Sequence, residues 1–246
     1  MEPDHLSEDR SREWYVPAFG PARFRFFVGL LFLPYTGMVL AYTVIGSMMA
    51  SRIHWDRVAA IVLIYSLGLG IGAHALDALG SKTTKPWGTV FSMRQLWVLA
   101  IASLVGAYAI GIYYMVLYAP LLWIVAILEG FFVFSYNLEW FHGRFHTDGW
   151  FAFSWGSLPV LAGYILQTNS LSVAVLVVAA SMGLLSLVEI KASRPYKELK
   201  RTASGLAGLD RRQITLRLEN GLKSLSFGVI LLGVGLLVWR GTLEVP

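Results

Sequence analysis

Long apolar runs dominate the pattern of the chain from residue 26 onward. Seven of them are nearly free of charge, and none alternates apolar and polar positions as the strands of a membrane barrel do. A helix that crosses a bilayer needs about 20 mostly apolar residues. The pattern therefore predicts an all-α, polytopic transmembrane helical bundle with about seven spans, at residues 26–50, 58–79, 95–113, 120–136, 151–166, 172–188 and 222–239.

Two polar segments flank or interrupt these runs. Residues 1–25 begin with several acidic residues, unlike a cleavable signal peptide, and continue with aromatic residues and arginines that suit the membrane interface. We expect them to form a cytoplasmic or interfacial segment ahead of a single transmembrane domain at 26–246. The second segment, at about 191–220, is basic and predicts a cytoplasmic loop, in which 209–222 has the spacing of a surface helix.

Composition supports the membrane class. Hydrophobic residues make up 56% of the 246-residue chain and charged residues only 14%, whereas a soluble domain carries roughly 25% charged residues. The chain has no cysteine, which excludes disulfides, thiol catalysis and cysteine-ligated metals. In the second run, Gly68, Gly70 and Gly72 have the spacing that allows another helix to approach closely.

The positive charges are distributed unevenly between the two sides of the predicted bundle. With seven spans, 17 of the 20 lysines and arginines fall on the side of the N-terminus. The positive-inside rule then predicts a multi-pass protein of the cell membrane with a cytoplasmic N-terminus and an outside C-terminus. This topogenic charge accounts for the net charge of +5, so nucleic-acid binding is not expected, and the basic segment is also expected to meet anionic membrane lipids.

Few ionisable residues interrupt the apolar runs, and such residues mark functional sites by default. His74 and Asp77 lie three residues apart near the cytoplasmic end of the second span, and Glu189 ends the sixth. We expect them to converge on one cytoplasmic cavity. Glu129 falls near the middle of the fourth span, where a carboxylate needs a polar partner. The structural alternatives are carboxylates that only meet water at helix ends, and a Glu129 that only completes a hydrogen bond.

The sequence around these residues resembles the UbiA-type intramembrane prenyltransferase superfamily. The family places the pattern Asn-Asp-x-x-Asp-x-x-x-Asp after its second helix, often followed by Lys-Pro. Here residues 73–81 align with that pattern and residues 85–86 are Lys-Pro; Asp77 matches the second aspartate, while Ala73, His74 and Ser81 replace the other three residues. Residues 135–164 resemble the region from helix four into helix five. The second family motif, Asp-x-x-x-Asp, becomes Glu189 to Ser193.

This resemblance implies transfer of an isoprenoid group from a prenyl diphosphate to a lipid-soluble acceptor, with Mg2+ as cofactor. It also implies a UbiA-like fold, from which the chain departs in having seven predicted spans where nine are usual, as though the last two were absent. The catalytic and metal-binding residues would be Asp77, Glu189 and His74, and the substrate-binding residues Lys82, Lys85, Arg194, Lys197 and Tyr136. Magnesium prefers oxygen ligands, so the loss of aspartates leaves catalytic activity an open question.

Two other functions fit the sequence. Glu139-x-x-His142 resembles half of a di-iron helix motif, and with His146 as a further ligand it suggests a metal-dependent membrane enzyme of another class. Imidazole favours transition metals over magnesium. Alternatively, the chain is a non-catalytic membrane or lipid-binding protein that kept the scaffold and lost most of the metal-binding aspartates.

Overall fold

The computed structural model describes residues 13–80, 90–201 and 208–243. In these ranges every regular element is helical and no strand occurs, which confirms the predicted all-α class. The elements in chain order are α1 (Ala22–Leu30), α2 (Leu33–Met48), α3 (Trp55–Tyr65), η2 (Ser66–Ala73), α4 (His74–Gly80), α5 (Met93–Leu117), α6 (Leu122–Asn137), η3 (Phe141–Gly143), α7 (Asp148–Phe151), η4 (Ala152–Ser157), α8 (Leu158–Thr168), α9 (Val173–Arg201) and α10 (Gly208–Leu243).

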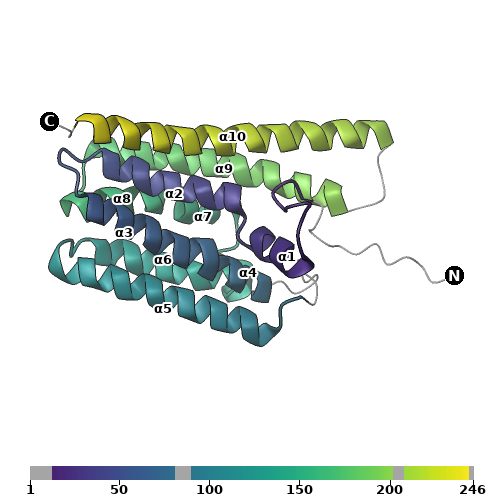
Figure 1. The fold of residues 1–246 in the computed structure, drawn as a ribbon, viewed down its shortest axis with the longest axis horizontal. Helices are drawn as coiled ribbons and strands as arrows, with labels where there is room; N and C mark the ends of the chain where they lie inside the picture. Colours follow the sequence, from purple (N-terminus) through teal and green to yellow (C-terminus); the bar gives the residue numbers. More distant parts are fainter. Residues whose placement is uncertain (1–12, 81–89, 202–207, 244–246) are drawn as a thin grey trace.

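The long helices lie side by side along the longest axis of the molecule (Figure 1). Helix α2 packs between α8 and α10, and α9 packs against both α10 and η4. On the other side of the bundle, α5 packs against α3, η2 and α4. Helix α1 and the end of α10 lie at opposite ends of the bundle (Figure 1).

Six helical stretches of the described chain are long and apolar enough to cross a membrane: 22–48, 55–80, 93–117, 148–168, 173–200 and 210–243. The predicted fourth span corresponds to α6, which has only 16 residues and is about 24 Å long at 1.5 Å per residue. An integral membrane protein is therefore supported, whereas the count of seven crossings stays a prediction.

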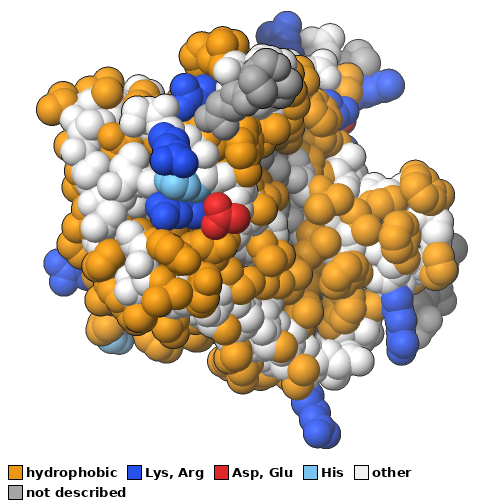
Figure 2. Space-filling view, turned by 60° about the vertical axis from the view of Figure 1, so that its left-hand side comes forward, with side chains coloured by type: hydrophobic (Ala, Val, Ile, Leu, Met, Phe, Trp, Pro, Cys, Tyr) orange, Lys and Arg blue, Asp and Glu red, His pale blue; other side chains and the backbone are white. Residues whose placement is uncertain are grey.

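The outer surface of the bundle suits a lipid environment. Large apolar side chains are more than half exposed on α5, α9 and α10, including Val105 at 63%, Val173 at 77% and Leu231 at 69%. Figure 2 shows one face on which hydrophobic side chains cover most of the surface and charged side chains gather in a few places. A soluble monomer rarely exposes apolar area this extensive.

Helices extend into much of the predicted basic segment at 191–220, including the expected surface helix at 209–222. Helix α9 continues to Arg201 and α10 begins at Gly208, so the structure describes helix on both sides of residues 202–207. Lysine and arginine are good helix formers, which explains why the basic sequence prolongs the two helices. Pro195 lies inside α9 and removes one backbone donor there.

Three spans contain irregular backbone at the same end of the bundle. Phe32 separates α1 from α2 in the left-handed conformation, with φ of 45°, and the Thr36 hydroxyl donates a 2.6 Å hydrogen bond to the Leu31 carbonyl. The second and fifth spans contain the π-helical stretches η2 and η4. Such stretches occur frequently at functional sites, and here they position His74 and Trp155.

Glycines allow the closest helix contacts. A Cβ on Gly46 of α2 would lie 2.0 Å from the Val160 carbonyl oxygen of α8, and one on Gly163 would lie 2.0 Å from the Thr43 oxygen. The predicted close approach at residues 68–72 is also present, since a Cβ on Gly72 would lie 3.0 Å from Leu104 Cγ of α5. Small residues thus bring the backbones together, as is common between membrane helices.

Candidate functional site

A polar cavity of about 290 Å³ opens between α2, α4, α6, η4 and α9. Six residues that the sequence singled out line it, from three separate spans: His74, Asp77, Tyr136, Glu189, Arg194 and Lys197. His146, the third residue of the alternative metal set, lines it as well. The expected convergence of the second, fourth and sixth spans is therefore present, while the role of each residue stays a prediction. Lys82 and Lys85 lie outside the described residues.

His74 is held by contacts on several sides. Its Nε2 atom lies 3.2 Å from the Thr36 hydroxyl oxygen. The Thr36 hydroxyl also donates to the Leu31 carbonyl, so it can accept from Nε2 in the tautomer that carries a hydrogen there. The imidazole stacks on Phe32, with ring centroids 4.7 Å apart, and contacts Trp155 at 5.2 Å.

Two cations of α9 line the cavity. Arg194 and Lys197 are three residues apart, which puts them on one helix face. The Lys197 ammonium lies 5.0 Å from the centre of the Phe32 ring and 5.9 Å from that of Tyr35, distances typical of cation–π contacts. Arg194 Nη1 lies 2.9 Å from Asp148 Oδ1 in an ion pair. Its Nη2 atom is buried and has no hydrogen-bond partner in the described part of the chain.

Carboxylates face the cavity from two helices. Asp77 on α4 is partly buried, Glu189 on α9 is only 5% exposed, and Glu198 is exposed. Among the described residues, however, no three histidines, cysteines, aspartates or glutamates come close enough to form a metal site. Magnesium wants about six oxygen ligands and keeps waters or substrate phosphates among them. The described side chains therefore do not fit a resident magnesium ion by themselves.

The half di-iron motif at Glu139 and His142 does not lie on an α-helix, and metal binding by these residues stays a prediction. Glu139, Phe141 and His142 adopt left-handed backbone conformations, with φ of 51°, 55° and 58°. His142 is exposed in the short 3-10 turn η3, and neither Glu139 nor His142 lines the cavity. His146 instead stacks on Tyr136 at 4.4 Å, and its Nδ1 lies 3.0 Å from the Tyr136 carbonyl oxygen.

Some of the basic residues near the cavity have structural roles. Glu219 of α10 accepts a 2.7 Å hydrogen bond from Lys223, pairs with Lys200 of α9 at 3.4 Å, and accepts from the Tyr196 hydroxyl at 3.3 Å. This network ties the extensions of α9 and α10 together. The cations that face the cavity, Arg194 and Lys197, are thus distinct from those that join the helices.

Several cavity residues were not predicted from the sequence. The aromatic wall consists of Phe32, Tyr35, Phe151 and Trp155, and Glu198 adds a carboxylate. Aromatic residues are frequent throughout the apolar runs, so none of these stood out. The one available signal was the Pro34 interruption of the first span, which coincides with the left-handed Phe32.

No protein-family model matches the sequence, and neither a curated protein nor a solved structure is significantly similar to it. The resemblance to UbiA-type prenyltransferases therefore rests on the quoted residues alone.

Proposed function

We propose that this integral membrane protein binds a prenyl diphosphate in the polar cavity and transfers the isoprenoid group to a lipid-soluble acceptor. The observation that carries the proposal is the presence of Arg194 and Lys197 beside an aromatic wall, in a cavity at one end of an apolar helical bundle. Such a cavity combines cations for a diphosphate with apolar surroundings for its chain. The resemblance of residues 73–86 to the first family motif points to the same chemistry.

In the proposed reaction, the bond between C1 of the isoprenoid and the diphosphate oxygen breaks, and the electron pair leaves with the diphosphate. Arg194 and Lys197 would neutralise the departing charge, which is worth most in a site with little water. The aromatic side chains of the cavity wall would stabilise positive charge on the allylic carbons by cation–π interaction. The acceptor then bonds to C1 and releases a proton.

In this proposal, magnesium binds only together with the prenyl diphosphate. Asp77 and Glu189 offer oxygen ligands, but the described residues form no three-ligand site. Phosphate oxygens would have to complete the coordination sphere. We therefore assign no step to the metal, and the expected binding of a transition metal by Glu139, His142 and His146 is not proposed.

Transfer is tested by incubating the purified protein with labelled prenyl diphosphates of several chain lengths, magnesium and a membrane lipid extract. We expect label in a lipid product, and loss of that product in Arg194→Gln. Lys191→Gln is the matched control, because Lys191 lies one turn earlier on α9, is exposed and does not line the cavity. No transfer with any chain length would contradict the transferase.

A non-catalytic lipid-binding protein is the second candidate. It is favoured by the finding that the described residues lack a three-ligand metal group. Replacing Asp77 and Glu189 together with alanine separates the two candidates in the host organism. A wild-type lipid and quinone profile would favour the non-catalytic protein, whereas a changed profile would favour the enzyme.

The proposed orientation puts the polar cavity on the cytoplasmic side. It is supported by the excess of lysine and arginine at that end of the bundle. A reporter fused after residue 246 should lie outside, and one inserted near residue 204 should be cytoplasmic. A cytoplasmic reporter at residue 246 would contradict the odd number of crossings.

A further inference from the structure

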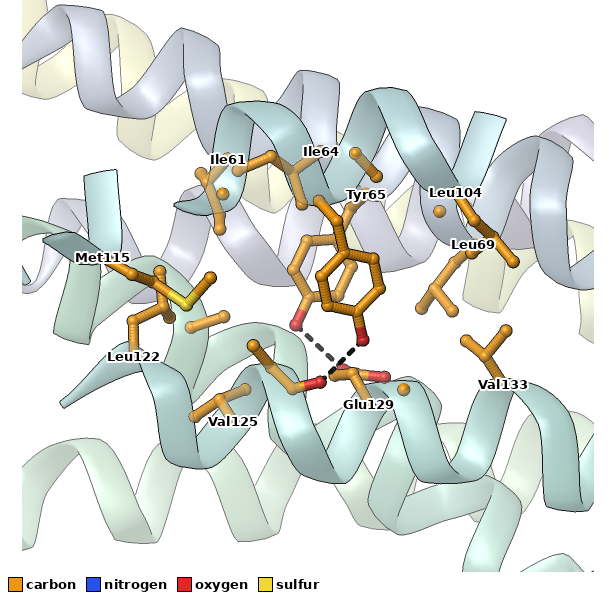
Figure 3. A pocket seen from close by; sticks show the side chains of 17 residues that line it. Ile61, Ile64, Tyr65, Leu69, Leu104, Met115, Leu122, Val125, Glu129 and Val133 are labelled. Atoms are coloured by element: carbon orange, nitrogen blue, oxygen red, sulfur yellow. Dashed lines mark hydrogen bonds between the residues drawn. The ribbon is translucent and has the colours of Figure 1, made fainter. Parts of the chain in front are cut away.

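A second cavity lies deeper in the bundle, around the middle of α6. It measures about 80 Å³ and is lined by side chains of α3, η2, α5, α6 and α8. Figure 3 shows Glu129 projecting from α6 toward Tyr65, with apolar side chains such as Ile61, Leu69 and Val133 around them. Among the described residues that line this cavity, Glu129 is the only charged one.

Not every polar group of this cavity has a hydrogen-bond partner among the described residues. The Tyr65 hydroxyl donates a 2.8 Å hydrogen bond to Glu129 Oε1, and the Tyr108 hydroxyl donates one of 2.9 Å to the Ala126 carbonyl. Both tyrosine hydrogens are thus already used. Glu129 Oε2 is buried and has no hydrogen-bond partner in the part of the chain that the structure describes. Burying a polar atom without a hydrogen-bond partner costs free energy. A ligand that supplies this partner would therefore be stabilised at Oε2.

The cavity is accessible from the side of the bundle. Ile64, Tyr108 and Glu129 retain partial exposure, and neighbouring Ile112 and Ile127 are 42% and 66% exposed. Helices α5 and α6 make few direct contacts although they are consecutive in the chain. A molecule dissolved in the bilayer can therefore reach Glu129 without passing through water.

The size and chemistry of the cavity restrict what it can hold. A volume of about 10–15 Å³ suffices for one water and about 150 Å³ for benzene, so this cavity suits a chain end of a few carbon atoms. A divalent cation needs more oxygen ligands than one carboxylate. A hydroxyl group can either donate to a carboxylate oxygen or accept from a protonated one. A hydroxyl group can therefore form a hydrogen bond with Glu129 Oε2 whether the carboxyl group is ionised or protonated.

We propose that Glu129, Tyr65 and the surrounding apolar residues form an intramembrane site for the hydroxyl end of a lipid-soluble aliphatic alcohol, whose chain extends into the bilayer. This site is separate from the polar cavity. Glu129 lies seven residues before Tyr136 on α6, or about 10 Å along the helix axis. An alcohol bound at Glu129 is thus too far away to be the group that reacts in the polar cavity.

The probe for this site is tritiated 1-dodecanol, with binding to the detergent-solubilised protein measured by scintillation proximity. We expect saturable binding that unlabelled dodecanol displaces. Tridecane, which replaces the hydroxyl with a methyl group, should displace it at least tenfold less well, the factor expected for one buried hydrogen bond. Equal displacement by tridecane, or no saturable binding at all, would overturn the proposal.

Three substitutions test whether dodecanol binds at Glu129. Glu129→Leu should weaken dodecanol binding at least tenfold, whereas Glu129→Gln, which keeps hydrogen-bonding atoms in the same place, should retain it within a factor of about three. Gly111→Leu should block the cavity while Glu129 stays in place, because Gly111 lines it and a Cβ there would lie 3.6 Å from Met115 Cε. Lys191→Gln is the control. Unchanged binding in a Glu129→Leu variant that elutes as a monodisperse species would overturn the assignment.

Discussion

The two ends of the helical bundle use polar side chains in opposite ways. At the end away from the polar cavity, Gln167 bonds to both backbone groups of His54, accepting from the nitrogen at 2.7 Å and donating to the oxygen at 3.1 Å. Arg57 donates to the carbonyls of Leu166 and Gln167, each at 3.2 Å, and lies 4.9 Å from the Tyr118 ring centre. These side chains satisfy backbone groups that helix ends leave open.

Arg240, near the end of α10, also donates hydrogen bonds to backbone carbonyls. Its Nη2 atom donates to the carbonyls of Ala50 and Ser51, at 2.6 and 3.0 Å. At the cavity end, by contrast, Arg194 and Lys197 line the polar cavity together with Asp77 and Glu189. Basic side chains thus bond to backbone carbonyls at one end of the bundle and line a cavity at the other. Residue type alone does not distinguish a structural from a binding role.

The largest effect is expected for the double variant Arg194→Gln, Lys197→Gln. Each charge-assisted hydrogen bond to a phosphate contributes about 1.5–3 kcal/mol, so the affinity for a prenyl diphosphate should fall at least about 100-fold. Equilibrium binding to the purified protein measures it, with Lys191→Gln as control. An affinity unchanged by the double variant would place the diphosphate elsewhere.

At the opposite end, Gln167→Leu should affect stability and leave binding intact. Gln167 is 4% exposed, and leucine would leave the His54 N–H without its partner, at a cost of about 2 kcal/mol, whereas the His54 carbonyl keeps its bonds from the Arg57 and Val58 nitrogens. We expect a lower melting temperature with an unchanged prenyl diphosphate affinity. Gln167→Glu keeps the side-chain oxygen that accepts from the His54 nitrogen, so its melting temperature should fall less than that of Gln167→Leu. A weaker affinity in a folded Gln167→Leu protein would show that the two ends are not independent.

The smallest effect is expected for Asp148→Asn. The ion pair of Asp148 with Arg194 is partly exposed, at 29% and 40%, and such pairs contribute at most about 1 kcal/mol. Stability should change little, and prenyl diphosphate affinity should stay within about threefold because Arg194 keeps its charge. A large loss of affinity would mean that Asp148 is needed to orient Arg194.

The length and apolarity of the runs predicted the helical class and the approximate position of each span. The breaks inside the spans were not predictable in the same way. Left-handed backbone at Phe32 and the π-helical stretches at 66–73 and 152–157 depend on packing between helices, which local sequence patterns do not encode. The basic segment at 191–201 was expected to be a loop because it is polar, although its residues favour helix.

The candidate site was partly predictable for a geometric reason. Alternating spans return every second connection to the same end of a bundle, so His74, Asp77, Glu189 and the residues after Glu189 were expected together there. The partners of His74 could not be foreseen, because Thr36 and Phe32 reach it only through the packing of α1 and α2 against α4 and η2. The helical spacing assumed for Glu139 and His142 is absent, because left-handed residues interrupt the backbone there.

The most direct test of the central claim is the melting temperature of the purified protein with magnesium and a prenyl diphosphate, added separately and together. Ligand binding to the folded state stabilises it by about 2.7 kcal/mol at a hundredfold excess over the dissociation constant. We predict little change with magnesium alone and a clear rise with prenyl diphosphate and magnesium, which the Arg194→Gln, Lys197→Gln variant loses. An unchanged melting temperature of the wild-type protein, with prenyl diphosphates of every chain length, would contradict a diphosphate site in the polar cavity.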